Sequence, residues 1–310
     1  MTPEIPVAYC FDSKYAPYAA VSTYSLVKSS KSRLKIYWVT PLEYLEVATL
    51  LLEHLKELNI EIQIVTPGNE SFINWRQSNH ITRAAYFRLL LPNLINENKL
   101  IYLDCDTLVL NDLEALYKIE MNGCYIGGVE DISSGNSSKV PRVEKDIYIN
   151  SGVLLMDLEA LRSDNFLKKC EVIYETYGEL ITWHDQCVIN KYAEGKKFLL
   201  DKKWNQQIYT HNINEDNWSQ YINPNCTNII HFIGGIKPWE SWCNKLIADF
   251  WWDHANQLSI PGLKPAEITN INQALDIASI LDGHQCYKEA SGLKSSIIKW
   301  LMDLINNPRP

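Results

Sequence analysis

The sequence predicts an α/β protein in which helices cover a sheet that is parallel in its first part. Apolar, strand-like segments alternate with amphipathic, helix-like segments over the first hundred residues, and this alternation is typical of strand–helix–strand units. Two strand-like segments end on acidic residues, at Asp12 and at the pair Asp104 and Asp106. Ligands bind beyond the carboxyl ends of parallel strands, so these positions also indicate where a site should lie.

The elements are expected in a regular order. The first helix has a proline near its first turn, where proline is favoured, and the third is expected to stop at Pro92. The second part is mixed, with a loop-rich stretch at 201–228 and helical patterning from residue 241 to the end. Strands are expected at 5–12, 34–40, 60–66, 99–106, 124–131, 149–158 and 228–235, and helices at 17–28, 42–58, 82–91, 158–180 and 186–192.

Composition and charge exclude several classes of protein. The chain has 310 residues, 46% of them hydrophobic, which is enough for a full core. A net charge of −8 argues against nucleic acid as the main partner. The eight cysteines form no CxxC pair and are expected to be free, buried thiols in a reducing compartment. No secretion signal or spanning helix is evident, so a cytoplasmic protein is expected.

The segment KLIYLDCD carries two carboxylates at its end. Asp104 and Asp106 flank Cys105, and residues i and i+2 of an extended chain point to the same side. Two converging carboxylates repel each other unless a cation lies between them or one is protonated, and their hard oxygens suit Mg²⁺ or Mn²⁺. The alternatives are aspartates that cap a turn, or the nucleophile loop of a haloacid dehalogenase-like phosphatase, which DCDTLV resembles. No second acidic motif of that class follows.

A second motif, HFIGGIKPW, follows the last strand-like segment. The imidazole of His231 offers a third ligand for a cation held by the two aspartates. Gly234 lets the backbone pass close to a ligand, and Lys237 offers a charge for a phosphate oxygen. The alternative is a strand–turn junction with a histidine satisfied in the core.

Four segments, LIYLDCDTLVL, NSGVLLMDL, WHDQCVIN and HFIGGIKPW, occur in this order. Together they resemble glycosyltransferase family 8, over about the first 245 residues. The resemblance implies a GT-A type, Rossmann-like mixed sheet flanked by helices, with a catalytic domain at 1–245 and a small C-terminal helical extension at 246–310. It also implies Mn²⁺ (or Mg²⁺) held by Asp104, Asp106 and His231, with Lys237 on the diphosphate of a UDP-sugar.

The same resemblance implies roles for residues in four further segments. Asp12 and Tyr15 match positions that hold the uracil, and Arg88 and His80 match positions near the donor. Asp185 and Gln186 match sugar-facing residues, with Gln186 beside the anomeric carbon. A glutamine is a poor nucleophile, so double displacement is hard to build and front-face attack with retention is expected. The remaining residues assigned to the donor site are Cys10, Cys105, Asn150, Ser151 and Gly234.

The expected activity is therefore transfer of galactose or glucose from a UDP-hexose to a glycan, glycolipid or glycoprotein acceptor. A non-catalytic nucleotide-sugar-binding or glycan-binding protein and a self-glycosylating enzyme are alternatives. The tail has Leu293, Ile297, Leu301 and Leu304 at helical spacing. That face is expected either to pack on protein or to contact the inner face of a membrane peripherally. The sequence gives no oligomeric state.

Overall fold

The structure is a computed structural model that describes residues 4–68, 71–78, 82–133, 138–268, 271–283 and 287–306. The chain forms two compact units, each of which is described by itself. The first comprises Met1–Gln207, Tyr221–His231 and His254–Ile260, and the second comprises Ile208–Gln220, Phe232–Asp253 and Pro261–Pro310. The single division near residue 245 remains a prediction.

The first unit is built on a seven-stranded mixed sheet with the order β3-β2-β1-β4-β7-β6-β8. The ladders β1–β2, β2–β3, β1–β4 and β6–β8 are parallel, whereas β7 runs antiparallel to both β4 and β6. The predicted α/β class with a mixed sheet is confirmed. The strands are β1 (Glu4–Cys10), β2 (Arg33–Val39), β3 (Glu61–Val65), β4 (Lys99–Leu103), β6 (Ile126–Glu130), β7 (Ile149–Asp157) and β8 (Lys197–Leu199).

The strand order reverses between β1 and β4. The chain builds outward from β1 to β3 and then returns to place β4 on the other side of β1. The carboxyl ends of these two parallel neighbours therefore lie side by side, and such a switch point is where open α/β sheets bind ligands. Asp12 follows β1, and Asp104 follows β4 directly.

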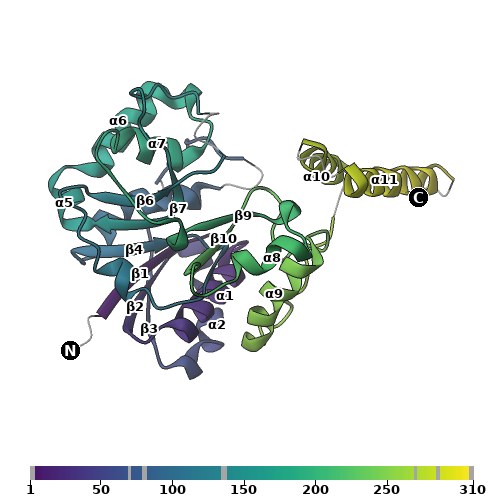
Figure 1. Cartoon of the computed structure of the whole chain (residues 1–310), viewed down its shortest axis with the longest axis horizontal. Helices are drawn as coiled ribbons and strands as arrows, with labels where there is room; N and C mark the ends of the chain where they lie inside the picture. Colours follow the sequence, from purple (N-terminus) through teal and green to yellow (C-terminus); the bar gives the residue numbers. More distant parts are fainter. Residues whose placement is uncertain are drawn as a thin grey trace. The chain divides into compact units, whose positions relative to one another are not determined.

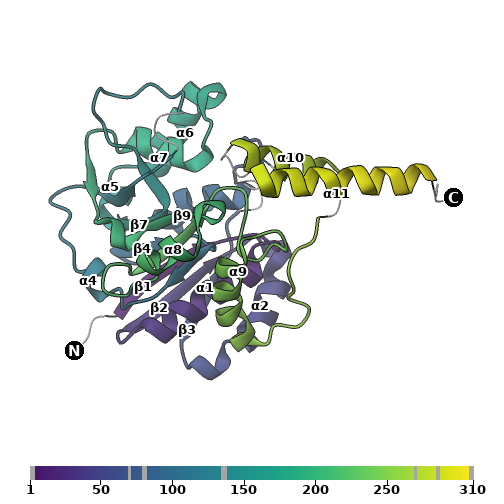
Figure 2. The ribbon, with the colours of Figure 1, turned by 45° about the vertical axis from the view of Figure 1, so that its right-hand side comes forward.

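Two helices, α1 (Ala16–Ser29) and α2 (Leu45–Glu53), cover one face of this sheet. On that face Ser22 of α1 donates to the hydroxyl of Tyr9 at 3.3 Å, and the Trp38 indole donates to Thr23 at 3.1 Å. These bonds satisfy polar atoms that would otherwise be buried without partners. Figures 1 and 2 show α1 and α2 on one side of the strands and α6 and α7 on the other.

The other face packs against a cluster that joins strand residues to five helical segments. Two predictions about these segments are wrong. Pro92 does not end a helix but lies in the first turn of α3, where its missing N–H costs nothing. The helix expected at 158–180 is broken, because Asn165 adopts a left-handed backbone with φ 54°. The segments are η3 (Arg83–Leu90), α3 (Leu91–Leu94), α5 (Leu158–Ser163), α6 (Phe166–Tyr177) and α7 (His184–Tyr192).

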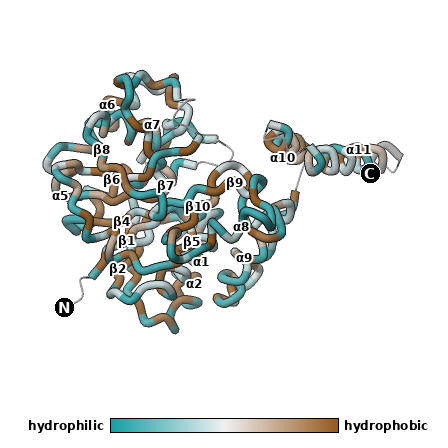
Figure 3. The backbone as a smooth tube through the Cα atoms, viewed as in Figure 1, coloured by the Kyte–Doolittle hydropathy of each residue, from teal (hydrophilic) through white to brown (hydrophobic). Residues whose placement is uncertain are grey.

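A second sheet has the order β5-β10-β9. Within the first unit, β5 pairs antiparallel with β10, and Thr107 lies opposite His231. Most of β10 is coloured as hydrophobic in Figure 3, as its buried residues require. The loop-rich stretch predicted at 201–228 contains a strand, β9, and a helix, α8. The elements are β5 (Thr107–Val109), β9 (Gln206–Tyr209), β10 (Ile229–Ile233), α4 (Glu114–Tyr117) and α8 (Glu215–Tyr221), with short 3₁₀ turns at η1 (Leu42–Tyr44), η2 (Lys56–Leu58), η5 (Gly178–Leu180), η6 (Lys202–Trp204), η7 (Thr210–Asn212) and η8 (Asn256–Leu258).

The second unit is mainly helical. Ile277 and Leu281 of α10 pack with Ala290 of α11 in a small buried cluster that also contains Ile236. The helical pattern expected from residue 241 onward is interrupted at 259–268. Among the described helices, none combines the length and apolarity that a membrane span requires. The long helices here are α9 (Lys245–Ala255), α10 (Ile271–Gly283) and α11 (Tyr287–Asn306).

Candidate active site

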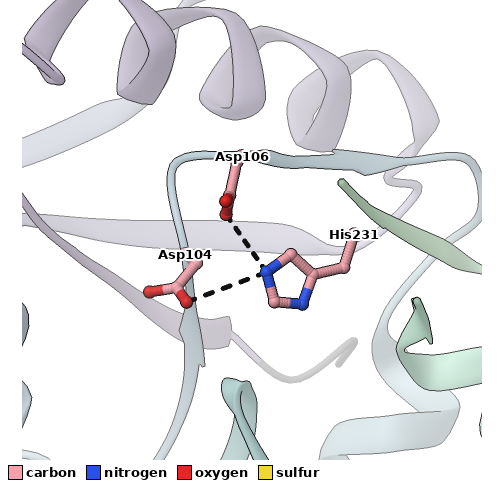
Figure 4. A group of neighbouring side chains, drawn as sticks. All are labelled: Asp104, Asp106 and His231. Carbon is pink, nitrogen blue, oxygen red and sulfur yellow. Dashed lines mark ion pairs between the residues drawn. The ribbon is translucent and has the colours of Figure 1, made fainter. Parts of the chain in front are cut away.

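Three side chains that the sequence analysis assigned to a metal converge in the first unit. Nε2 of His231 lies 3.2 Å from Oδ1 of Asp106 and 3.9 Å from Oδ2 of Asp104. One ligand atom from each residue lies within 4.8 Å of the others, as Figure 4 illustrates. Two carboxylate oxygens and an imidazole nitrogen form a donor set that suits Mn²⁺ or Mg²⁺.

The reason for this convergence differs from the predicted one. The two aspartates were expected at the end of an extended strand, but β4 ends at Leu103 and the chain turns at once. The Thr107 hydroxyl donates to the Asp104 carbonyl at 2.8 Å, and the Asp104 amide donates to the Gly152 carbonyl at 2.8 Å. The turn between β4 and β5, rather than strand alternation, brings both carboxylates to His231 of β10.

Asp104 is held on its other oxygen by two buried groups. The Tyr102 hydroxyl donates to Oδ1 at 2.6 Å, and the Arg88 guanidinium donates to the same atom at 2.8 Å. Arg88 also lies over the Tyr102 ring, 4.4 Å from its centroid. Oδ2 of Asp104 is thereby left to face His231. Such partners of a ligand fix its orientation and tune its affinity.

Arg88 links the metal-site carboxylate to Asp185. Its Nε lies 3.2 Å from Oδ2 of Asp185, and Nη1 donates to the Ser151 carbonyl at 2.7 Å. Burial lowers the pKa of Arg88, but Asp104 and Asp185 raise it by more, so the guanidinium stays charged. Burial raises the pKa of Asp185 to about 6, against the opposing effect of Arg88. The cluster of Arg88, Asp104 and Asp185 contains one guanidinium and two carboxylates. With both carboxylates ionised its net charge is negative, unless a metal cation is bound.

The sugar-facing residues predicted on β7 and α7 lie together beside Arg88. The Ser151 hydroxyl donates to Asp185 at 2.8 Å, and the Ser151 amide donates to Oε1 of Gln186 at 2.9 Å. Nε2 of Gln186 donates to Asp131 at 3.3 Å, and Nδ2 of Asn150 donates to the same carboxylate oxygen at 2.9 Å. The amide of Gln186 is therefore oriented from both ends.

The residues predicted to hold the base lie at the end of β1. Asp12 accepts hydrogen bonds from the Tyr15 amide at 3.0 Å and from the Thr82 hydroxyl at 2.8 Å. A cavity of about 300 Å³ opens here, lined by Asp12 and Thr82 among others. Cys10 and Cys105 are buried nearby, and burial raises the pKa of both thiols. Neither thiol is therefore activated as a nucleophile.

Three further assigned residues are described separately from this site. His80 falls outside the described residues. Gly234 and Lys237 belong to the second unit, where Gly234 has φ +84° and packs so closely on Tyr209 that a Cβ would lie 2.9 Å from its ring. The Lys237 ammonium donates to the Phe232 carbonyl at 2.7 Å. The seven described cysteines are free, as expected, but Cys226 is exposed and Cys124 and Cys243 are only half-buried.

Four residues of this site were missed from the sequence. They contact the assigned residues but were given no role, although Tyr102 and Gly152 lie within the quoted segments. Only Gly152 gave a signal, because an isolated glycine inside a strand often marks a close approach of another group. A Cβ at Gly152 would overlap the His231 ring and lie 2.7 Å from Oδ2 of Asp104. The others are Tyr102, Asp131 and Asn205.

His184 opens α7, next to Asp185, and predicts a pH effect on stability. Both of its ring nitrogens are buried without a hydrogen-bond partner among the described residues, and burial lowers its pKa to about 4. The unfolded chain takes up a proton near pH 6.5 and the folded chain only near 4, so stability falls as pH drops through this window.

At pH 5 the difference between the two pKa values lowers the free energy of unfolding by about 2 kcal/mol. His184→Asn cannot titrate and tolerates the left-handed backbone at this position, φ 46°. Urea unfolding measures the free energy of unfolding at pH 7.5 and at pH 5. The decrease between the two pH values should be smaller by about 2 kcal/mol in the variant than in the wild-type protein. Equal losses in the two proteins would show that His184 is not the group responsible.

Comparison with known proteins places this site in a class of sugar-transferring enzymes. Residues 6–243 match the model of glycosyl transferase family 8, so the predicted resemblance is confirmed. The chain belongs to this family. Membership over this length leaves no room for the phosphatase alternative.

Several relatives and solved structures are similar to this chain. It is 31% identical to general stress protein A of Bacillus subtilis over 65% of this chain and 68% of that protein. It is 25% identical to a lipopolysaccharide 1,2-glucosyltransferase of Escherichia coli over 76% of this chain and 73% of that protein. The structure of the galactosyltransferase LgtC, solved with donor and acceptor sugar analogues, superposes with a TM-score of 0.73 at 21% identity, over 83% of this chain and 98% of LgtC.

Other curated relatives are longer than the region they share with this chain. The matches span 49% of the glycosyltransferase GlyF and 42% of GlyB of Streptococcus pneumoniae, and 62% of a glycosyltransferase of Haemophilus influenzae. The LgtC likeness shows the GT-A fold.

Proposed function

We propose that this family 8 protein transfers galactose or glucose from a UDP-sugar to a glycan, glycolipid or glycoprotein acceptor, with retention of the anomeric configuration. The observation that carries the proposal is the convergence of Asp104, Asp106 and His231 at the switch point of the sheet, beside the buried cluster of Arg88 and Asp185. A donor with a diphosphate and a sugar needs both a cation site and a set of hydroxyl-binding groups.

The residues present fit a divalent cation. Three ligand atoms converge, and Gly152 provides the space next to them that any larger residue would fill. Asp104, Asp106 and His231 would hold Mn²⁺ or Mg²⁺, with Mn²⁺ favoured by the imidazole nitrogen. When bound, such a cation stabilises the negative charge that develops on the diphosphate as it leaves.

The residues of the chain itself account for binding and orientation of the donor. We assign Asp12 to a hydrogen bond with the uracil, since its carboxylate lines the cavity at the end of β1. Tyr15 is assigned to stacking on the base. The roles of Gly234 and Lys237 at the diphosphate and of His80 at the sugar remain predictions from the sequence motifs.

The sugar would face Asp185 and Gln186. In its ionised form Asp185 accepts hydrogen bonds from hydroxyl groups, and Arg88 keeps a positive charge next to it. Gln186 is a weak nucleophile, and the Ser151 amide already occupies its Oε1. These features favour front-face attack, in which the acceptor hydroxyl replaces the leaving diphosphate on the same face of the sugar.

A UDP-release assay over a panel of donors, with Mn²⁺, with Mg²⁺ and with a chelator, tests this function directly. UDP release from UDP-galactose or UDP-glucose that the chelator abolishes and Mn²⁺ restores is the expected result. Donor binding without turnover on any acceptor would favour the non-catalytic alternative. A mass increase of the protein itself would favour self-glycosylation.

We further propose that the enzyme works in the cytoplasm and contacts the inner face of a membrane through α11. Several large apolar side chains near its end are exposed, and Ile298, Leu301 and Met302 lie on one face of the helix, at positions i, i+3 and i+4. The helix is also longer than its partner α10 by seven residues. Apolar side chains in this setting, close to Lys294 and Lys299, are typical of helices that lie on lipid. Such a contact would hold the enzyme at the membrane that carries the acceptor, as for a lipopolysaccharide.

A double variant, Ile298→Ser with Met302→Ser, should weaken binding of the full chain to anionic vesicles at least about tenfold, because each side chain contributes ~1.5–3 kcal/mol when buried. Flotation of the protein with the vesicles measures this effect. Val172→Ser removes a similarly exposed side chain from α6 and should leave flotation unchanged. Flotation that is equally strong in the double variant would exclude α11 as the contact.

A further inference from the structure

A chain of buried side chains runs from the candidate metal ligand His231 to the residues that face the sugar. Nδ1 of His231 lies 3.0 Å from Oδ1 of Asn205, and Nδ2 of Asn205 donates to Oδ1 of Asn150 at 2.9 Å. Asn150 in turn donates to Asp131 at 2.9 Å. None of these side chains was assigned a part in holding the imidazole.

The direction of every hydrogen bond in this chain can be deduced. The backbone amide of Gly152 donates to Oδ1 of Asn150 at 2.9 Å, and a backbone N–H can only donate. The Asn150 atom that faces this amide is therefore its oxygen. The NH₂ group of Asn150 then faces the carboxylate of Asp131, which can accept its hydrogen bond. The Asn205 atom that faces the same oxygen must then be its NH₂.

The tautomer of His231 follows from this order. If Asn205 directs its NH₂ toward Asn150, its Oδ1 faces the imidazole and can only accept. Nδ1 must therefore carry the proton of the neutral ring, and Nε2 presents a lone pair toward Asp104 and Asp106. A lone pair aimed at two carboxylate oxygens is the arrangement that a cation requires.

We propose that Asn205 is a positioning residue that sets the tautomer of His231 for metal binding, and that Asp131, through Asn150, fixes the orientation of Asn205. Asp131 also accepts from Nε2 of Gln186 at 3.3 Å, so one buried carboxylate orients both the metal-site histidine and the glutamine that faces the sugar. The part of this inference that concerns the metal rests on the proposed function, whereas the tautomer does not.

The tautomer can be measured without any metal. Two-bond ¹H–¹⁵N correlation spectra of the histidine-labelled full chain, at a pH where His231 is neutral, report which ring nitrogen carries the proton. The signals of His231 are identified by their loss in His231→Gln. We expect protonated Nδ1 and unprotonated Nε2. The opposite tautomer in the wild-type protein would overturn the proposal, and this measurement needs no variant of Asn205 that folds.

Metal affinity gives a second, independent readout. Asn205→Leu keeps the size of the side chain and removes both hydrogen bonds, so Mn²⁺ affinity, titrated by electron paramagnetic resonance, should fall about 10–100-fold. Asn190→Leu removes an equally buried asparagine that, among the described residues, bonds only to backbone atoms of Ile149 and Gln186, and it should change this affinity less than about threefold.

The outcomes separate this inference from the proposed function. Unchanged Mn²⁺ affinity in Asn205→Leu, with normal binding by the wild-type protein, would overturn the inference alone. A wild-type protein that binds no Mn²⁺ would overturn the proposed function, and the tautomer measurement would still decide what Asn205 does.

Discussion

Asp106→Asn should lower kcat/KM for sugar transfer on the order of 10³-fold, since a lost cation ligand removes several kcal/mol of charge stabilisation in the transition state. The substitution keeps the size and shape of the side chain but removes the charge that faces Nε2 of His231 at 3.2 Å. Mn²⁺ affinity should fall together with activity, and a raised Mn²⁺ concentration should restore part of the turnover.

Asp106 is a cleaner test than Asp104. Removing the Asp104 carboxylate would also deprive the buried Arg88 of one counter-charge and the Tyr102 hydroxyl of its acceptor, so lost activity would be mixed with lost stability. Asp249→Asn changes an exposed aspartate paired with Lys245 and serves as the matched control. Full activity and normal Mn²⁺ binding in Asp106→Asn, measured at limiting metal, would refute the metal assignment.

The sheet could be predicted from local sequence patterns, whereas the metal-binding residues could be predicted only from resemblance to a family. Strands such as β1 and β4 are continuous apolar runs, and their alternation with helices is a local pattern. The pairing of Asp104 and Asp106 with His231 is not local, because more than a hundred residues separate them. That pairing came from resemblance to family 8, and the physical argument for it, strand alternation, was wrong in detail.

What the sequence could not provide is the set of partners that orients the site. Tyr102, Asp131 and Asn205 are ordinary polar or aromatic residues in apolar or mixed segments, and their roles depend on tertiary contacts. The break at Asn165 is different, since asparagine adopts the left-handed backbone more readily than most residues and so carried a local signal for the end of a helix. Gly152 is the exception, because its position inside an apolar strand was itself informative.

Gly152→Ala should abolish most of the activity through a single methyl group. The new Cβ would overlap the His231 ring and lie 2.8 Å from its Nδ1 and 2.7 Å from Oδ2 of Asp104. The ring and the carboxylate cannot both stay in place, so either the bond between Nδ1 and Asn205 or the approach of Nε2 to the aspartates must be lost. A misplacement of about 1 Å at a reacting site costs on the order of 100-fold in rate.

The control for this variant lies on the neighbouring strand. A Cβ at Gly128 would lie 2.7 Å from Cδ1 of Ile149, a core side chain that belongs to the same sheet. Gly128→Ala should therefore cost about 1–3 kcal/mol of stability by overpacking, as Gly152→Ala does, but it should leave Mn²⁺ affinity unchanged.

The comparison therefore depends on two measurements made on both variants, urea unfolding and Mn²⁺ titration. If Gly152→Ala loses metal affinity and Gly128→Ala does not, at similar cost in stability, the glycine serves the metal site rather than the core. If Gly152→Ala keeps the Mn²⁺ affinity of the wild-type protein, His231 can move aside without consequence. The imidazole would then have no part in binding the cation.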